Sequence, residues 1–260
     1  MRFRRASKQA TPIATLPLPS AADIPADLHL TILVLSDGTV HGANAPAAGT
    51  GALMGSMHAA WPLAQAEAQR LGRPVRVSVG QQDGTITAYI VYPDGRLDPA
   101  PTHPQPAMPD HFDSRWLDGA LNQHPMVEAV RAAHCATDWR AAQVAASRMA
   151  AYVRAELGDD HPHTVLAAEF EAFFALHARD WTAAVRLYTA VAEGRHRLSA
   201  PPGDTQRALH NAVAAWLNAR TDRLSGAHGY ALAHLLIRIA PHDHQALSAV
   251  LRSLPPAPSA

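Results

Sequence analysis

Two stretches, ATDWRAAQVAA (136–146) and ARDWTAAVRLY (178–188), repeat nearly the same residues 42 positions apart. Each contains Asp-Trp, then one polar residue and a pair of alanines, and each lies between two apolar segments. Asp138 and Asp180 are well placed to cap a following helix, because a carboxylate accepts hydrogen bonds from the free amides of the first turn. A helix-start signal that recurs at a fixed spacing is typical of stacked helical repeats.

The two tryptophans are expected to be equivalent packing residues. Trp139 and Trp181 each follow the capping aspartate, so each places a large apolar side chain at the start of a helix, against the first helix of its own repeat. Ala184 supplies a small surface where two helices approach closely. The same 42-residue phase reaches Asp222, which no tryptophan follows, as expected of a terminal repeat that has drifted.

Residues 113–254 carry apolar residues with a period close to 3.6, interrupted by turn-forming sequences such as SAPPGD and SGAHG. The predicted helices span residues 125–136, 138–157, 162–177, 180–196, 204–219, 227–239 and 243–253. Helix pairs that recur at a fixed spacing predict a right-handed solenoid of about three helix pairs with a closing helix. The predicted fold class is therefore mostly α.

A smaller unit of mixed pattern, residues 27–98, precedes the helical region. Apolar runs of β-forming residues at 28–35, 75–79 and 85–92 are bounded by turn sequences such as SDG, QQDG and PDG, and TVH (39–41) after SDG predicts a strand that returns beside the first. Between them, MHAAWPLAQAEAQRLG places apolar residues on one helical face and ends at Gly72, with an internal proline that is expected to kink or restart the helix. The pattern predicts a small α+β domain of order β-β-α-β-β.

Three segments are predicted to lie outside these two domains. Residues 1–26 are rich in Ala, Pro, Ser and basic residues and predict a disordered basic arm. Residues 99–112 contain five prolines, which lack an amide donor and have a fixed φ, and so predict a semi-rigid linker. Residues 255–260 form a tail of the same kind.

Three stretches, LGDDHPHT (157–164), ARDWTAAVRLYTAV (178–191) and ALHNAVAAWLNA (208–219), carry a family resemblance. Over about residues 120–254 the chain resembles the tetratricopeptide repeat family, and more narrowly its 42-residue, kinesin-light-chain-like variety. In this comparison Trp181 stands at the aromatic position, Ala184 at the small-residue position and Tyr188 one turn later. The glycine that usually precedes Asp-Trp is replaced by Thr137 and Arg179.

The resemblance implies a peptide-binding groove lined by the first helices of successive repeats. Asn211 matches the characteristic asparagine of the family, which contacts the backbone of the bound peptide, and Asn218 lies two turns further along the same predicted helix. In the preceding repeat Glu169, Phe173 and His177 follow one helical stripe. These three are candidate peptide contacts, although the same stripe is equally compatible with the core or the outer surface.

Composition and charge exclude several function classes. The net charge is zero and the pI is about 7.3, so no overall field favours nucleic acid or an anionic membrane. No stretch approaches the roughly 18 apolar residues of a membrane span. The single cysteine, Cys135, excludes an internal disulfide and a cysteine-based zinc cluster.

Other chemistry-bearing residues have simpler interpretations. The pairs His161/His163 and His242/His244 fall in predicted turns without a third ligand at metal-binding spacing, so they are interpreted as exposed turn histidines. The glycine-rich stretch GTGALMG (49–55) fits neither the dinucleotide-binding nor the Walker A pattern and predicts a flexible loop. We therefore expect no catalytic residue, no metal site and no cofactor.

These features favour a non-catalytic adaptor of the bacterial cytoplasm that binds another protein or a peptide with its helical repeats and does not engage a membrane. Two alternatives stay open. In the first, the domain at residues 27–98 senses a small ligand in a pocket beside GTGALMG, and the repeats self-associate. In the second, the protein is a nucleic-acid-associated regulator, an alternative that depends mainly on the basic arm.

Overall fold

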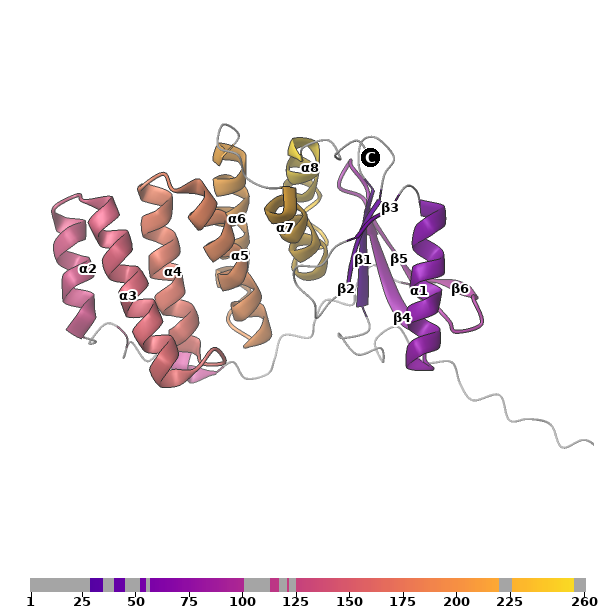
Figure 1. Ribbon diagram of the computed structural model, residues 1–260, viewed down its shortest axis with the longest axis horizontal. Coiled ribbons are helices and arrows are strands. Elements are labelled where there is room, and N and C mark those ends of the chain that lie inside the picture. Colours follow the sequence, from indigo (N-terminus) through magenta and orange to yellow (C-terminus); the bar gives the residue numbers. More distant parts are fainter. Residues whose placement is uncertain are drawn as a thin grey trace, which may run out of the picture.

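The computed structural model describes residues 29–34, 40–44, 52–54, 57–100, 113–116, 121, 125–219 and 226–254. In this part of the chain a mixed β-sheet with one covering helix is followed by a row of helices, and the sheet lies at the end of that row (Figure 1). The molecule is mostly helical, as expected. The predicted arm, the predicted tail, most of the predicted linker and Asp222 lie outside the described residues.

The sheet contains two central parallel strands with antiparallel strands on both sides. Its described strands are β1 (His29–Val34), β2 (Val40–Asn44), β3 (Ala52–Met54), β4 (Val75–Gly80), β5 (Ile86–Val91) and β6 (Leu97–Ala100). Their order in the sheet is β3-β2-β1-β4-β5-β6. β1 pairs parallel with β4. The helix α1 (Met57–Leu71) precedes β4 in the sequence and carries the chain back, so that β4 runs in the same direction as β1.

The two edge strands were not predicted from the sequence. β3 lies within GTGALMG, where a flexible loop was expected, and pairs with β2. β6 runs into the segment that was predicted to be a linker, so the prediction that the linker begins at residue 99 is wrong. The predicted order β-β-α-β-β is correct for the four inner strands, and the edges complete the sheet.

Pro99 fits into β6 because its nitrogen faces away from the sheet. The Tyr92 N–H donates to the Arg96 carbonyl at 3.0 Å, and the register then places Tyr89 opposite Pro99. Hydrogen-bonded and non-hydrogen-bonded pairs alternate along an antiparallel ladder, so Pro99 falls at a non-hydrogen-bonded position. A proline there removes an amide donor from the outer edge and opposes pairing with another chain.

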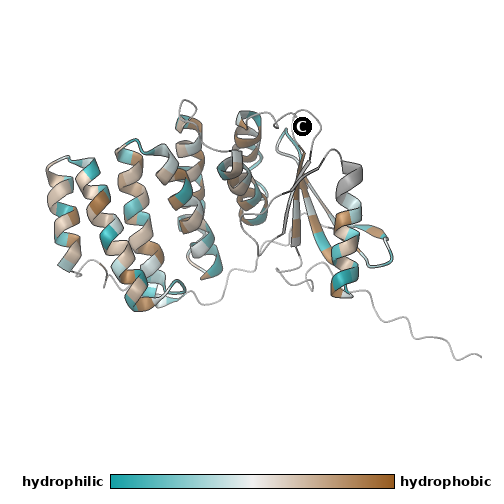
Figure 2. Cartoon of the chain, viewed as in Figure 1, coloured by the Kyte–Doolittle hydropathy of each residue, from teal (hydrophilic) through white to brown (hydrophobic). Residues whose placement is uncertain are grey.

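Seven α-helices follow the sheet in the described residues, and a short 3₁₀ helix, η3 (Ser114–Trp116), precedes them. They are α2 (Pro125–Cys135), α3 (Trp139–Leu157), α4 (Pro162–His177), α5 (Trp181–Arg197), α6 (Pro202–Asn218), α7 (Gly226–Ile239) and α8 (His244–Ser253). All seven agree with the predicted helices within two residues at each end. Each packs against its neighbour in the chain, and each carries both hydrophobic and hydrophilic residues (Figure 2).

The two Asp-Trp segments adopt the same backbone conformation. Asp138 accepts a hydrogen bond from the Ala141 amide at 3.0 Å, and Asp180 accepts the equivalent bond at 3.1 Å, which confirms both predicted caps. The preceding residues, Thr137 and Arg179, have φ angles of 55° and 59°. These values lie in the left-handed region, which glycine adopts more readily than other residues do.

The helix α1 covers one face of the sheet. Ala64 and Ala68 are fully buried and pack with Val75, Val77 and Val79 of β4. The helix continues through its internal proline and ends at a glycine with φ of +66°, as the sequence predicted for its end.

The opposite face of the sheet packs against α7, although the sequence predicted two separate domains. Leu33 and Ile86 share one core cluster with Ile237 of α7. At Gly80 an added Cβ would lie 2.4 Å from the Ile237 Cδ1, so the Ile237 side chain fills the space that a side chain at Gly80 would need. β4 is consequently buried along its whole length, and the sheet and the helices have a common core.

The β4–β5 turn also contacts the start of α8. His244 Nδ1 lies 2.7 Å from the Gly84 carbonyl oxygen. A Cβ at Gly84 would lie 2.2 Å from the His244 carbonyl oxygen, and the φ of Gly84 is +89°. Glycine is therefore required at this contact both for its conformation and for its lack of a side chain.

Gly84→Ala and Gly72→Ala form a matched pair that measures this contact. Both glycines have a positive φ, but a Cβ at Gly72 would meet nothing within 4 Å. We expect Gly72→Ala to lower the free energy of unfolding by about 1–2 kcal/mol, from backbone strain alone. Gly84→Ala should cost about 1–3 kcal/mol more, from steric overlap. Urea denaturation measures both, and equal losses would show that the turn does not pack on α8 as described.

Candidate functional site

A buried arginine joins three helices at the centre of the helical row. Arg195, near the end of α5, is only 3% exposed. Its Nη2 donates to Glu169 Oε2 on α4, and its Nη1 lies 3.5 Å from Asp204 Oδ2 on α6. A buried guanidinium requires such partners, because an uncompensated charge in the interior is strongly unfavourable.

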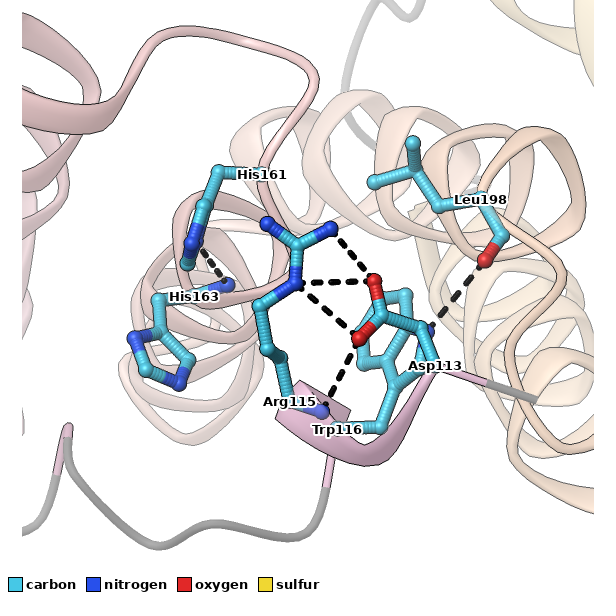
Figure 3. Close-up of polar contacts among 6 residues, drawn as sticks. All are labelled: Asp113, Arg115, Trp116, His161, His163 and Leu198. Carbon is cyan, nitrogen blue, oxygen red and sulfur yellow. Dashed lines mark hydrogen bonds and ion pairs between the residues drawn. The ribbon is translucent and has the colours of Figure 1, made fainter.

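An indole packs against the same arginine. The Trp116 ring centroid lies 5.0 Å from the Arg195 guanidinium carbon, and Trp116 Nε1 donates to the Leu198 carbonyl at 3.3 Å (Figure 3). Sequence reasoning assigned no role to Trp116 or Arg195. An arginine in the apolar α5 run and an aromatic residue after the turn-forming DSR were the signals that could have indicated them.

Tyr188 lies near two of the proposed groove positions, Asn211 and Glu169. The side chain is 2% exposed. Burial and the nearby Glu169 carboxylate raise the pKa of Tyr188 to about 12, while a hydrogen bond from the Asn211 side chain and the charge of Arg207 act against that rise. The Asn211 side chain therefore lies within hydrogen-bonding reach of the Tyr188 hydroxyl, and the Glu169 carboxylate lies near enough to act on it through its charge.

We call Glu169, Tyr188, Arg195, Asp204 and Asn211 the polar cluster. It reaches the surface through its carboxylates, since the side chains of Glu169 and Asp204 are 20% and 31% exposed. At the surface Arg207 Nη2 donates to Asp204 Oδ1 at 2.7 Å. The cluster is thus anchored by a buried cation and presents hydrogen-bonding groups to solvent.

Phe173 and His177 belong to a different group of side chains, the aromatic cluster, which also contains His134, Trp139 and Phe174. Trp139 stacks on His177 with ring centroids 4.8 Å apart, and Phe173 lies 4.3 Å from His177. His134 on α2 packs against Trp139 at 5.4 Å. Phe173 remains 37% exposed, so part of this cluster is accessible to a partner.

The remaining predicted positions have local roles. Asn218 is exposed, and its Nδ2 donates to the Ala214 carbonyl of its own helix at 2.8 Å, so it joins neither cluster. Ala184 is fully buried, as expected of a position where helices approach closely. Trp181 is half-buried at the start of α5, equivalent in position to Trp139.

The histidine pairs take part in helix starts. The ring nitrogen Nδ1 of His161 accepts a hydrogen bond from the His163 amide at 3.1 Å, which caps α4 (Figure 3). His244 contacts Gly84, as described above. Among the residues that the structure describes, no group of three His, Cys, Asp or Glu side chains is arranged to hold a metal ion.

A shallow hollow lies on the sheet, but not next to the described strand of GTGALMG. It is formed between α1 and the β5–β6 hairpin and is lined by Trp61, Pro62, Gln65, Val91, Gly95 and Leu97. In the described part of the chain, no helix is long and apolar enough to cross a bilayer.

Comparisons with family models, with curated proteins and with solved structures find no match for this chain.

Replacing Arg195 tests the anchoring of the polar cluster. Arg195→Met removes the buried cation and leaves Glu169 and Asp204 without it, so we expect the free energy of unfolding to fall by about 3–5 kcal/mol. Arg207→Met is the matched control, because it breaks an ion pair of a 60% exposed side chain and should cost about 1 kcal/mol or less. Chemical denaturation measures the free energy of unfolding of both variants. Similar losses for the two would contradict the anchoring role of Arg195.

Tyr188 predicts a loss of stability in alkali. Its folded pKa of about 12 exceeds its usual value of 10.0, so its contribution is complete below pH 10.0 and is lost as the pH rises to about 12. A shift of this size corresponds to about 2–3 kcal/mol. Tyr188→Phe should lack this component, so the stability difference between wild type and variant should change by that amount over this range. Urea denaturation measures both stabilities as a function of pH. If they change with pH in parallel, the Tyr188 hydroxyl is not buried and neutral in the folded protein.

Proposed function

We propose that the helical part of the chain is a right-handed solenoid of the tetratricopeptide type, which binds an extended peptide or a partner helix and catalyses no reaction. The contacts between helices support this arrangement. Besides their neighbours in the chain, α5 contacts α7 and α6 contacts α8. In pairs such as α4/α5 and α6/α7, the first helix of each pair would then lie on one side of the array and the second helix on the other. One face of the array would therefore be composed of first helices alone.

The observation that carries the proposal is the relation between Glu169 and Asn211. They are 42 positions apart, on α4 and α6, and both act on the Tyr188 hydroxyl, Asn211 through a hydrogen bond and Glu169 through its charge. In a solenoid, positions one repeat apart line up along the groove. Both side chains are partly exposed, so they offer a line of hydrogen-bonding groups.

A line of this kind suits the backbone of an extended peptide. Such a peptide presents amide donors and carbonyl acceptors at regular intervals, and each must be satisfied when it is buried. An asparagine amide can both donate and accept, and a glutamate carboxylate accepts. Asn211 is the main proposed contact, with Glu169 next to it.

The aromatic cluster would supply the apolar part of the interface. Partly exposed aromatic side chains are frequent anchors in protein interfaces, because they bury a large area with little loss of conformational entropy. Phe173 and His177 are the proposed contacts for an apolar side chain of the partner. Asn218, whose amide is engaged within its own helix, has no role in this proposal.

Binding of a selected peptide tests the proposal. We would select peptides from a random displayed library against the full chain and titrate the best one by calorimetry. Asn211→Ala would leave the Tyr188 hydroxyl without its partner and lower stability as well, so the substitution is made in a Tyr188→Phe background. There it should weaken binding about five- to thirtyfold, equivalent to about 1–2 kcal/mol, with little change in melting temperature.

Asn218→Ala is the matched control, since it removes the same amide from the same helix outside the clusters. It should leave the affinity unchanged. Failure to select any peptide, or equal affinities for the Asn211→Ala and control variants, would contradict the proposed groove.

A further inference from the structure

Residues Asp113–Trp116 lie between the sheet and the first helix of the row in sequence, yet they dock in the middle of the helical row. The Trp116 indole is 7% exposed and belongs to the same core cluster as Val165 and Ala200. The indole N–H donates to the carbonyl of Leu198, which is 82 residues away, at 3.3 Å. The indole thus occupies a slot formed by α4, the end of α5 and the α5–α6 turn.

The polar groups of the segment are largely satisfied within it. The Asp113 carboxylate accepts from the Arg115 backbone amide at 3.0 Å and from the Arg115 guanidinium at 2.9 and 2.5 Å (Figure 3). These bonds lower the pKa of Asp113. The Trp116 amide donates to the Asp113 carbonyl at 3.0 Å. The segment is therefore a self-contained turn that inserts a large apolar ring into the helical row.

The slot is adjacent to the proposed binding face through Arg195. The same guanidinium packs on Trp116 and bonds with Glu169. Removing the indole would admit water to the guanidinium, and a higher local dielectric weakens its attraction for the carboxylate. Glu169 would then be less firmly held in its position near Tyr188.

We propose that Asp113–Trp116 is an intramolecular latch, whose tryptophan docks reversibly in this slot and, when docked, holds Arg195 and Glu169 in the arrangement that binds the partner peptide. The effect on binding rests on the proposed function, whereas the reversible docking does not. The slot itself is a site for an indole side chain, and its ligand is the chain's own Trp116. Trp116 acts as a positioning residue, through Arg195.

Hydrogen exchange of indole N–H groups in the wild-type protein tests the docking. Trp216 is the internal reference, because it is 5% exposed and its Nε1 donates to Ser253 Oγ at 2.6 Å. If the latch opens locally, Trp116 should exchange at least about tenfold faster than Trp216 and should not respond to low urea concentrations. Equal rates with the same urea dependence would show that Trp116 opens only with global unfolding, and would overturn the latch.

Chemical complementation tests the slot. Trp116→Ala should bind N-acetyltryptophanamide at millimolar concentration, detected by NMR shifts at Arg195, and the wild type should not. If Trp116→Ala fails to fold, the exchange experiment on the wild type still decides the proposal. A folded variant that does not bind the probe would overturn it.

The effect on the binding face is measured with the selected peptide. Trp116→Ala should weaken peptide binding about fivefold or more, and Trp116→Phe, which keeps an aromatic ring over Arg195, should restore most of the affinity. If Glu169→Gln weakens binding but Trp116→Ala does not, the groove is correct and the coupling is wrong. If no variant affects binding while Trp116 exchanges locally, the proposed function fails and the docking stands.

Discussion

The parts of this protein pack closely at glycines, where a side chain of one element lies against the backbone of another. Gly80 meets Ile237 where the sheet packs on α7, and Gly229 meets Trp216, whose ring atoms would lie 2.6 Å from an added Cβ. Gly194 makes a similar approach to Val165. Interiors are close-packed, so a methyl group added at these points would require the neighbouring side chains to shift. In the contact between the sheet and α7, the Ile237 side chain occupies the space that a side chain at Gly80 would need.

The polar cluster depends on that packing and adds a second constraint. Arg195 and Tyr188 are both buried, so their hydrogen-bonding groups require partners from neighbouring helices. Glu169, Asp204 and Asn211 supply those partners and are the side chains that reach the surface. The proposed binding groups are thus also structural groups, and a peptide would meet side chains that the core has already oriented. Such preorganisation reduces the entropy lost on binding.

Much of the helical part could be predicted because its signals are local. The caps at Asp138 and Asp180, the 3.6-residue period and the turn sequences each act over a few residues, and the helix boundaries followed from them. The features that were missed depend on distant partners. A proline is rarely compatible with a strand, but the register places the Pro99 nitrogen at the free edge of the sheet. The Trp116 indole bonds to a carbonyl that is 82 residues away. Of the predicted site residues, Glu169 and Asn211 both act on the Tyr188 hydroxyl, and they lie 42 positions apart in the sequence. Asn218 is not part of the polar cluster, because its amide donates to a carbonyl of its own helix. Its position in the helical pattern could not indicate that bond.

The packing of the sheet on α7 and α8 also bears on how the chain is made. β1, β4 and β5 leave the ribosome early, but the helices that cover their second face are the last described elements of the sequence. At typical translation rates about 150 residues take on the order of ten seconds to synthesise, and during that time Leu33 and Ile86 have no partner. The sheet therefore cannot complete its core until the helical row is almost finished. The nascent chain would expose an apolar sheet face for that interval. A chaperone that binds extended apolar segments could bind the chain in this state.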